Sequence, residues 1–479
     1  MDSPNNTVNN VNSILRTIFF ALLLDILAFT IILPLFPRIL DQYKLTDGSN
    51  KDTLFFYFLE KIKYYKFLIG ARSDLDIVLL GGAIGSLFSF LQFISSPHVG
   101  SLSDKYGRRT ILLLSMFGNA LSMLLWMFAK TFPIFLLSRI VGGLTEGNVQ
   151  MSIAMISDVT TDHNRSKGLA LVGIAFALGF TVGPPLGAFF SAIDLNQLFP
   201  HLKNLPFHQY SFPAVFAFVL ILIETFYMYL TLPETVNFKK NLEKSNKNEN
   251  ENDINVGESK SLLETKEALE KSSDVKLTEH SGKNVNILSF IHFFYLFFFS
   301  GMEFTLTFLT YDRFQFTNMS QGTLLGFIGI LSALVQGGYV RRVAHKSVHE
   351  RSLAIQGVLS CGIGLGIIAL VAKKYLGQQF LFVGASFLAF TSGTVVSSLT
   401  ALASFESKSS QGKNLGKFRA FGQLGRSVGP IFSSSIYWVY GGVYCYSIGS
   451  VFMLFVTVLM IYLIPSPGDW KNKEKVKVA

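Results

Sequence analysis

The segment GSLSDKYGRRT, residues 100–110, lies between two apolar segments that are each long enough to cross a bilayer. Four of its residues are charged: Asp104, Lys105, Arg108 and Arg109. Charges at this density cannot lie in hydrocarbon, so the segment is predicted to be a short polar loop between two membrane-spanning helices. Its excess of basic residues indicates the cytosolic side, because Lys and Arg are enriched in cytosolic loops.

The composition of the chain is that of an integral membrane protein. Of 479 residues, 50% are hydrophobic and 14% are aromatic, and the mean hydropathy is +0.41, which is too apolar for a soluble protein of this length. The net charge of +10 comes mostly from short loops between apolar runs, so nucleic acid is not expected as a partner. Both cysteines, Cys361 and Cys445, fall inside predicted spans and indicate neither a disulfide framework nor a metal site. The sequence shows no nucleophile with a base and no phosphate-binding loop, so neither an enzyme nor a cofactor is expected.

Windows of about 20 apolar residues predict twelve spans. They lie near residues 16–40, 75–98, 110–129, 132–156, 168–192, 211–232, 287–311, 321–340, 352–372, 378–403, 416–439 and 443–464. A polar segment between the sixth and seventh spans cannot form an apolar core and is expected to be largely disordered, with a helical patch near residues 261–270. The predicted regions are an N-terminal tail (1–15), a first six-helix bundle (16–235), a linker (236–286), a second six-helix bundle (287–464) and a basic C-terminal tail (465–479).

An even number of spans places both termini on one side of the membrane. The basic clusters of the loops and the C-terminal tail fall on that side, near residues 105–109, 165–167, 341–351, 408–417 and 471–477. The long first loop, residues 41–74, mixes acids and bases, but long loops translocate with little regard to charge. We therefore expect the tails and the linker to be cytosolic. No cleavable signal peptide is expected, because the polar start lacks a basic region and the first apolar run is too long.

Gly100 and Gly107 allow the two helices beside the loop to approach closely where the chain turns. An ordinary cytosolic loop explains the arginines but neither Asp104 nor the glycine spacing. The spacing G-x-L-x-D-K-x-G-R-R-x-x-x-L, from Gly100 to Leu113, resembles the loop signature of the major facilitator superfamily. The resemblance implies an all-α membrane fold of two pseudo-symmetric six-helix bundles and a transporter that works by alternating access.

Other segments resemble the drug:proton antiporters of that superfamily. The first span contains LDILAFTIILPLFP (residues 24–37), which is similar to the opening of tetracycline exporters, and the fourth places Arg139 in an R-x-x-x-G frame. The fifth span contains GFTVGPPLGAFF (residues 179–190). Its motif residues are Gly179, Gly183, Pro184 and Gly187. The resemblance implies a tightly packed, bent helix that seals against proton leak, and an ordinary helix contact is the alternative.

The second half resembles the tetracycline-transporter-like branch of animals and protists, which exports organic anions and drugs. The resemblance rests on FFFSGMEFTLTFLTYDRFQF (297–316), QGGYVRR (336–342) and LGRSVGPIFSSSIYW (424–438). It implies a small organic anion or drug-like molecule, together with protons, as partners. Glu146 departs from the pattern, because bacterial exporters have a small residue there, so their substrate cannot be carried over.

The ionisable residues expected within the hydrocarbon region are Asp25, Arg139, Glu146, Glu224, Glu303, Arg419 and Arg426. A charge at mid-bilayer costs about 2.5–3.5 kcal/mol even on the insertion scale, so each is a functional candidate. Asp25 is as well suited to a structural pairing with Arg139 as to a role in substrate or proton binding.

Glu303 is the leading candidate for the coupling proton, because its own span offers apolar and hydroxyl neighbours and no cation. Asp25, Glu146 and Glu224 follow. The alternative for Glu303 is a structural role, hydrogen-bonded to Thr305 or Thr307 or paired with Arg426.

Arg426 should reach a central cavity, and an arginine suits a carboxylate substrate because it binds carboxylates bidentately. Arg139 and Gln336 complete the expected substrate-binding set. The expected gate set is Gly100, Asp104, Gly107, Arg108, Arg109, Asp158 and Arg419. By resemblance, Asp104 should meet the start of helix eleven near Gly416, and Arg108 should meet Asp158.

These features predict a monomeric secondary transporter in membrane lipid that exports organic anions or amphipathic drugs against protons. A uniporter or symporter of a small metabolite is one alternative, and a non-transporting receptor or scaffold of the same fold is another. The segment ESKSLL, residues 258–263, fits an acidic dileucine sorting signal, so both the plasma membrane and an endolysosomal membrane stay open.

Overall fold

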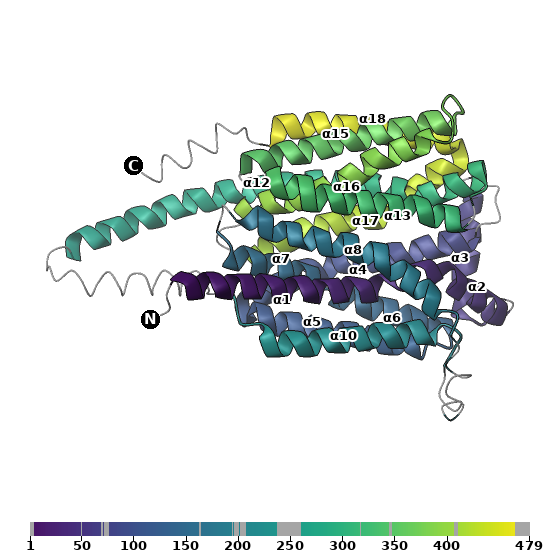
Figure 1. The fold of residues 1–479 in the computed structure, drawn as a ribbon, viewed down its shortest axis with the longest axis horizontal. Helices are drawn as coiled ribbons and strands as arrows, with labels where there is room; N and C mark the ends of the chain where they lie inside the picture. The colour runs from purple at the N-terminus through teal and green to yellow at the C-terminus, as the bar shows by residue number, and fades with distance from the viewer. Residues whose placement is uncertain are drawn as a thin grey trace.

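The computed structural model describes residues 4–48, 50–68, 70, 76–161, 164–193, 195, 201, 207–236, 260–316, 318–343, 347–406 and 411–464. These ranges form helices almost throughout and contain no strand. The spanning helices lie along the long axis of Figure 1, and both ends of the chain lie at the same end of the molecule. We call this end, where α1 begins and α18 ends, the terminal face. The architecture confirms the predicted all-α membrane fold.

The first bundle contains six spanning segments. They are α1 (Pro4–Thr30), α4 (Asp76–Tyr106), α5 (Arg108–Met127), α6 (Phe132–Thr145) with α7 (Asn148–Val159), α8 (Arg165–Phe190) and α10 (Ser211–Thr231). A 3-10 turn (Leu33–Leu35), α2 (Phe36–Asp47) and α3 (Leu54–Leu68) lie at the end opposite the terminal face (Figure 1).

The second bundle also contains six. They are α12 (Lys260–Phe314), α13 (Asn318–Leu334) with a π-helical turn (Val335–Val340) and α14 (Arg341–Val343), α15 (Ser347–Ala372), α16 (Phe380–Glu406), α17 (Gln411–Tyr440) and α18 (Gly442–Leu463).

The first span differs from the prediction at both ends. Helix α1 begins at Pro4, within the predicted tail, and ends at Thr30, ten residues before the predicted end. Pro34 and Pro37 explain the early end, because proline cannot donate a helical hydrogen bond and each occupies the first turn of a new helix.

The linker also differs from the prediction. Residues 260–286 belong to α12, so the predicted boundary between linker and second bundle falls inside one helix. The sequence ETKEALEK within this part is rich in residues that favour helix. Residues 237–259 of the predicted linker lie outside the described residues.

Ten of the described helices are long and apolar enough to cross a membrane. The two remaining spans are the α6–α7 pair and α17. The first is broken at Glu146 and Gly147, and the second carries several charged residues, among them Arg419 and Arg426. These two spans carry Arg139, Glu146, Arg419 and Arg426, four of the ionisable residues that the sequence places within the membrane.

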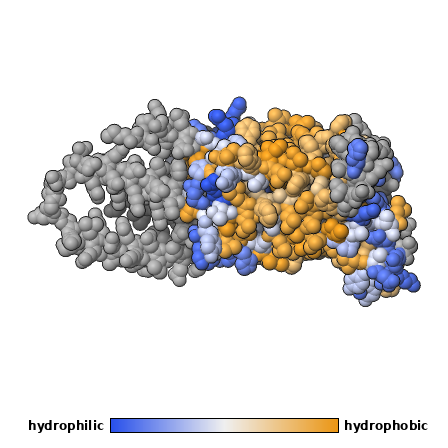
Figure 2. Space-filling model, turned by 90° about the horizontal axis from the view of Figure 1, so that it is seen from below, coloured by the Kyte–Doolittle hydropathy of each residue, from blue (hydrophilic) through white to orange (hydrophobic). Residues whose placement is uncertain are grey.

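On the face shown in Figure 2, an apolar band covers the helices, and hydrophilic residues gather at both of its ends. Large side chains in the band are exposed, such as Phe117 at 67%, Phe226 at 65% and Val451 at 66%. A continuous exposed apolar surface of this kind is suited to lipid and not to water.

Small residues allow α8 to pack tightly on α1. Gly179, Gly183 and Gly187 are buried, and side chains added there would collide with Ile26, Thr30 and Ile31. Thr30 Oγ1 donates to the Gly179 carbonyl at 3.0 Å. Close helix contact is therefore the structural role of this motif.

Candidate functional site

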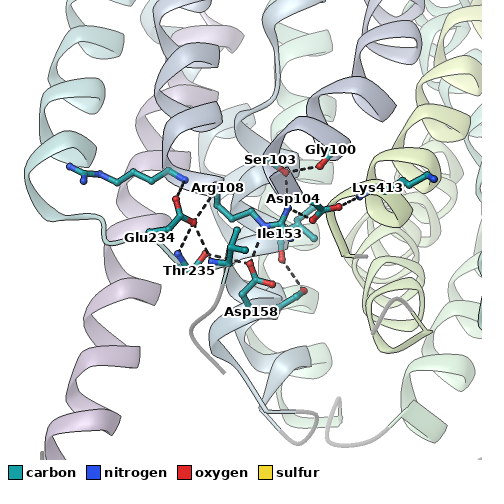
Figure 3. A network of polar contacts seen from close by, with 12 residues as sticks. Gly100, Ser103, Asp104, Arg108, Ile153, Asp158, Glu234, Thr235 and Lys413 are labelled. Carbon is teal, nitrogen blue, oxygen red and sulfur yellow. Dashed lines mark hydrogen bonds and ion pairs between the residues drawn. The ribbon is translucent and has the colours of Figure 1, made fainter. Parts of the chain in front are cut away.

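The polar segment 100–110, predicted to be a loop, instead forms the last turns of α4 and the first turn of α5, with only Gly107 between the two helices. We keep the name polar loop for this segment, which contacts α7, α10 and α17 at the terminal face (Figure 3). Arg108 Nη1 lies 2.7 Å from Asp104 Oδ1, and Arg108 Nε donates to Asp158 Oδ2 at 3.0 Å. Asp104 Oδ2 accepts a hydrogen bond from the backbone N–H of Lys413 at 2.8 Å. Lys413 lies in the first turn of α17, where the helix dipole favours a negative charge. The contacts implied by the sequence resemblance are present and connect the two bundles.

Asp158 lies at the end of α7 and is largely enclosed. Burial raises the pKa of Asp158 to about 6, although the neighbouring Arg108 guanidinium acts to lower it. Thr235 Oγ1 also donates to Asp158 Oδ2, at 3.4 Å. The ion pair with Arg108 is therefore sensitive to mild acidification.

Glu234 is a member of this network that the sequence analysis missed. Its carboxylate accepts hydrogen bonds from the backbone N–H groups of Arg108 at 2.9 Å and Arg109 at 3.2 Å, and so caps α5. Gly107 precedes this cap with a φ of 101°, and a side chain there would collide with Glu234. Arg109 Nη2 donates to the Tyr229 carbonyl at 2.6 Å. The loop is thus bonded to the end of α10 as well as to α7 and α17.

Further contacts close the terminal face between the bundles. Ser157 Oγ and Ser404 Oγ lie 2.7 Å apart, and Arg165 Nη1 donates to the Ser404 carbonyl at 3.3 Å. A side chain at Gly416 would meet Gln150 and the Ser96 carbonyl, both at 2.7 Å, so α17 lies directly against α7 and α4 here.

A cluster of carboxylates lies inside the first bundle, which we call the first-bundle cluster: Asp25, Glu146 and Glu224. Asn148 Nδ2 donates to Asp25 Oδ1 at 2.9 Å, and Asn119 Nδ2 donates to Glu146 Oε2 at 3.0 Å. Glu224 is only 1% exposed, its Oε2 is buried without a hydrogen bond, and the charges of the other two carboxylates act on it. The structure therefore assembles three of the four predicted proton-coupling residues.

The break between α6 and α7 shapes this cluster. Glu146 has an extended backbone, with φ −64° and ψ 91°, and α7 begins two residues later. Asp25 and Glu146 line a cavity of about 10 Å³, room for one water molecule, together with Asn119, Ser122 and Arg139. A broken helix that lines a buried polar cavity is typical of binding sites in membrane transporters.

Arg139 is enclosed in the first bundle. Its guanidinium lies 5.7 Å from the ring centres of both Trp126 and Phe135, its Nε donates to Ser138 Oγ, and its Nη2 is buried without a hydrogen bond. It lines the same cavity as Asp25, whose hydrogen bond goes to Asn148. Arg139 is therefore a buried positive charge beside the first-bundle cluster.

Glu303 and Arg426 form a separate group in the second bundle. Glu303 of α12 is exposed, and the Arg426 charge of α17 acts on it. Thr305 Oγ1 donates to the backbone carbonyls of Gly301 and Met302, each at 3.2 Å, so this hydroxyl is not directed at Glu303. The Thr307 side chain lies outside the described residues.

Gln336 lies apart from both groups. It occupies the π-helical turn after α13, is 3% exposed, and faces Gly173 of α8 so closely that a side chain at Gly173 would collide with it. The structure does not bring Gln336, Arg139 and Arg426 together in one site.

Comparison with known proteins agrees with this geometry. The sequence profile described as Major Facilitator Superfamily matches residues 18–404. The chain belongs to the major facilitator superfamily. It is therefore a membrane transporter and not an enzyme, as the sequence resemblance implied.

Within the superfamily, Major facilitator superfamily domain-containing protein 10 of Mus musculus is 32% identical over 96% of this chain and 95% of its own length. Tetracycline resistance protein, class B, of Escherichia coli is 25% identical over 76% of this chain and 80% of its own. The crystal structure of the human organic anion transporter MFSD10 (TETRAN) matches with a TM-score of 0.75 and 29% identity, covering 94% of this chain and 99% of that one. These relatives confirm the predicted tetracycline-transporter-like branch.

The same fold occurs in a more distant member. The proton:xylose symporter XylE matches with a TM-score of 0.69 at 15% identity, over 96% of this chain and 97% of that one. This likeness shows the shared fold alone.

Proposed function

We propose that this transporter exports organic anions or amphipathic drug-like molecules in exchange for protons, by alternating access. The observation that carries the proposal is the first-bundle cluster, in which buried Asp25 and Glu224 and half-buried Glu146 lie together among membrane-spanning helices. Two relatives support the class of substrate, since one is an organic anion transporter and another a tetracycline resistance protein.

Enclosed carboxylates are suited to proton coupling. Ionised groups inside a membrane protein are costly, so a carboxylate with a water-sized cavity beside it can alternate between a neutral and a charged form. Asp25 and Glu146 line this cavity and Glu224 lies near them, whereas Glu303 is open and faces a permanent cation. We therefore assign the coupling proton to the first-bundle cluster before Glu303, which the sequence alone favoured.

Arg426 is the proposed contact for an anionic substrate. It lies on a spanning helix, its charge acts on the exposed Glu303, and an arginine can bind a carboxylate bidentately. Arg426→Lys retains the charge but loses the planar guanidinium, so it should weaken transport of carboxylate substrates more than of neutral ones.

The polar loop with Asp104, Arg108 and Asp158 is the proposed gate. The termini are proposed to face the cytosol, in the plasma membrane or an endolysosomal membrane, and the protein is proposed to work as a monomer in lipid. A symporter or uniporter of a small metabolite is the competing function.

Transport in proteoliposomes tests the proposal. With an acidic lumen and a neutral bath, an exchanger should concentrate labelled organic anions inside, and dissipation of the pH gradient should abolish this. Asp25→Asn, Glu146→Gln and Glu224→Gln should lose concentrative uptake while substrate counterflow persists, and Lys417→Gln, an exposed residue of α17, is the control. Uptake that does not depend on the gradient would favour a uniporter, and no transport of any tested anion or drug would contradict the proposed substrate class.

A further inference from the structure

Helix α17 carries a cation of the second bundle to the edge of the first-bundle cluster. Gly416 lies against Gln150 of α7. Helix α7 runs toward the terminal face and α17 runs away from it, so positions farther along α17 face earlier positions in the fourth span. Arg419 follows Gly416 by three residues on the same helix face, and Glu146 precedes Gln150 by four. This register places Arg419 next to the break at Glu146.

The electrostatics agree with this placement. The charge of Arg419 acts on both Glu146 and Asp25. Arg419 Nε is buried and makes no hydrogen bond among the described residues. Other charged or titratable groups near the two carboxylates or Arg419, on the helices packed around them, are Arg139, Glu224, His292 and Arg426. Arg139 of the first bundle already lies beside the carboxylates, and Arg419 adds a positive charge that belongs to the opposite bundle.

We propose that Arg419 is an electrostatic latch: ionised Asp25 and Glu146 hold this cation of the second bundle and keep the terminal face closed, and proton binding to them releases it. This inference rests on the proposed proton-binding role of the cluster. The latch can act on closure because Arg419 belongs to the second bundle, whereas Asp25 and Glu146 belong to the first. Their attraction exists only while the two bundles meet at the terminal face.

Linkage fixes the direction of the effect. If closure of the terminal face favours the ionised carboxylates, proton binding must favour opening by the same factor. A proton that arrives from the opposite side would therefore open the terminal face and be released there. This is the order of events that exchange of substrate for protons needs.

Distance measurements between spin labels test the latch without substrate. Tyr106 of the first bundle and Arg342 of the second are exposed near the terminal face, and Cys361 and Cys445 are fully buried, so cysteines introduced at the two exposed sites should be labelled selectively. In nanodiscs, pulsed electron paramagnetic resonance should show a short distance at pH 8.5 and a growing long-distance population toward pH 5.

Variants isolate the role of Arg419 from that of Asp158, which titrates at the same face. At pH 8.5, Arg419→Gln should lower the ratio of the short-distance to the long-distance population by about 5-fold or more. Arg419→Lys should keep the short-distance population. Lys417→Gln, an exposed cation on the same helix, should behave as the wild type. In the Glu146→Gln background, Arg419→Gln should have a much smaller effect, because its main partner is already neutral.

The outcomes separate this inference from the proposed function. A wild-type pH response in Arg419→Gln, or equal effects of Arg419→Gln with and without Glu146→Gln, overturns the latch even if transport is proton-driven. A response that depends on Arg419 and Glu146 supports the latch even if flux assays show no proton coupling, in which case the proposed function fails alone.

Discussion

Glu234 shows how single residues beyond the loop motif hold the terminal face together. It follows the last helix of the first bundle and bonds two backbone N–H groups at the start of α5. The left-handed backbone of Gly107 and the closeness of Glu234 both require glycine at this position. The glycine in the motif is therefore explained by a carboxylate more than 120 residues away.

Replacing the cap should lower the stability of the protein. Glu234→Gln keeps the shape of the side chain but removes its charge, and we expect a loss of about 0.5–2 kcal/mol, the range measured for helix caps. In detergent, the thermal unfolding midpoint of Glu234→Gln should be lower than that of the wild type. Lys105→Gln, in the last turn of α4, should leave the midpoint unchanged. Equal midpoints for Glu234→Gln and the wild type would mean that the cap contributes nothing.

Asp158 should make stability depend on pH in a defined direction. Its pKa of about 6 lies above the ordinary value of 3.8, so the folded protein binds this proton more tightly than the unfolded chain does. Stability from this group is therefore gained as pH falls through 6 and lost as pH rises through it. From pH 7.5 to pH 5, the unfolding midpoint of the wild type should rise relative to that of Asp158→Asn. A difference between the two midpoints that does not change with pH would contradict the raised pKa.

At the scale of helices, the position of the fourth span was predictable from the sequence, but its break into two helices was not. The length of apolar runs located the fourth span, but not its break at Glu146, because the extended backbone there depends on Asn119 of α5 and on the cavity beside it. The loop contacts of Asp104 and Arg108 followed from a local motif. The caps and amide partners did not, since Glu234, Asn119 and Asn148 are ordinary polar residues until the helices are assembled.

The glycine face of α8 gives a prediction for helix packing. Gly183→Ala places a methyl group against Thr30 and should destabilise the protein by about 1–3 kcal/mol, the usual cost of overpacking. Gly85→Ala on α4 is the matched control, because a methyl group there meets open space and should be neutral or slightly stabilising. Equal unfolding midpoints for the two variants would show that the α1–α8 contact is loose.

At the scale of the whole molecule, the two bundles meet at the terminal face through several kinds of contact. The ion-paired loop, the Ser157–Ser404 hydrogen bond and the Arg165–Ser404 hydrogen bond all join them there. Alternating access requires all of these contacts to break together.

The proposed orientation rests on the basic loops, which are expected on the cytosolic side. Protease added outside intact cells or sealed organelles should therefore spare the linker. Cleavage of the linker from outside would reverse the proposed topology.

The most direct test of proton exchange follows the proton itself. The transporter is reconstituted into liposomes that contain a pH dye and a transported organic anion in the lumen. The pH is equal on both sides and the membrane potential is clamped. The liposomes are then diluted into anion-free buffer. Exchange predicts that the lumen acidifies as the anion leaves, whichever way the protein is inserted, and that Asp25→Asn combined with Glu146→Gln abolishes the acidification. A lumen that becomes alkaline as the anion leaves, or keeps its pH, would contradict the account.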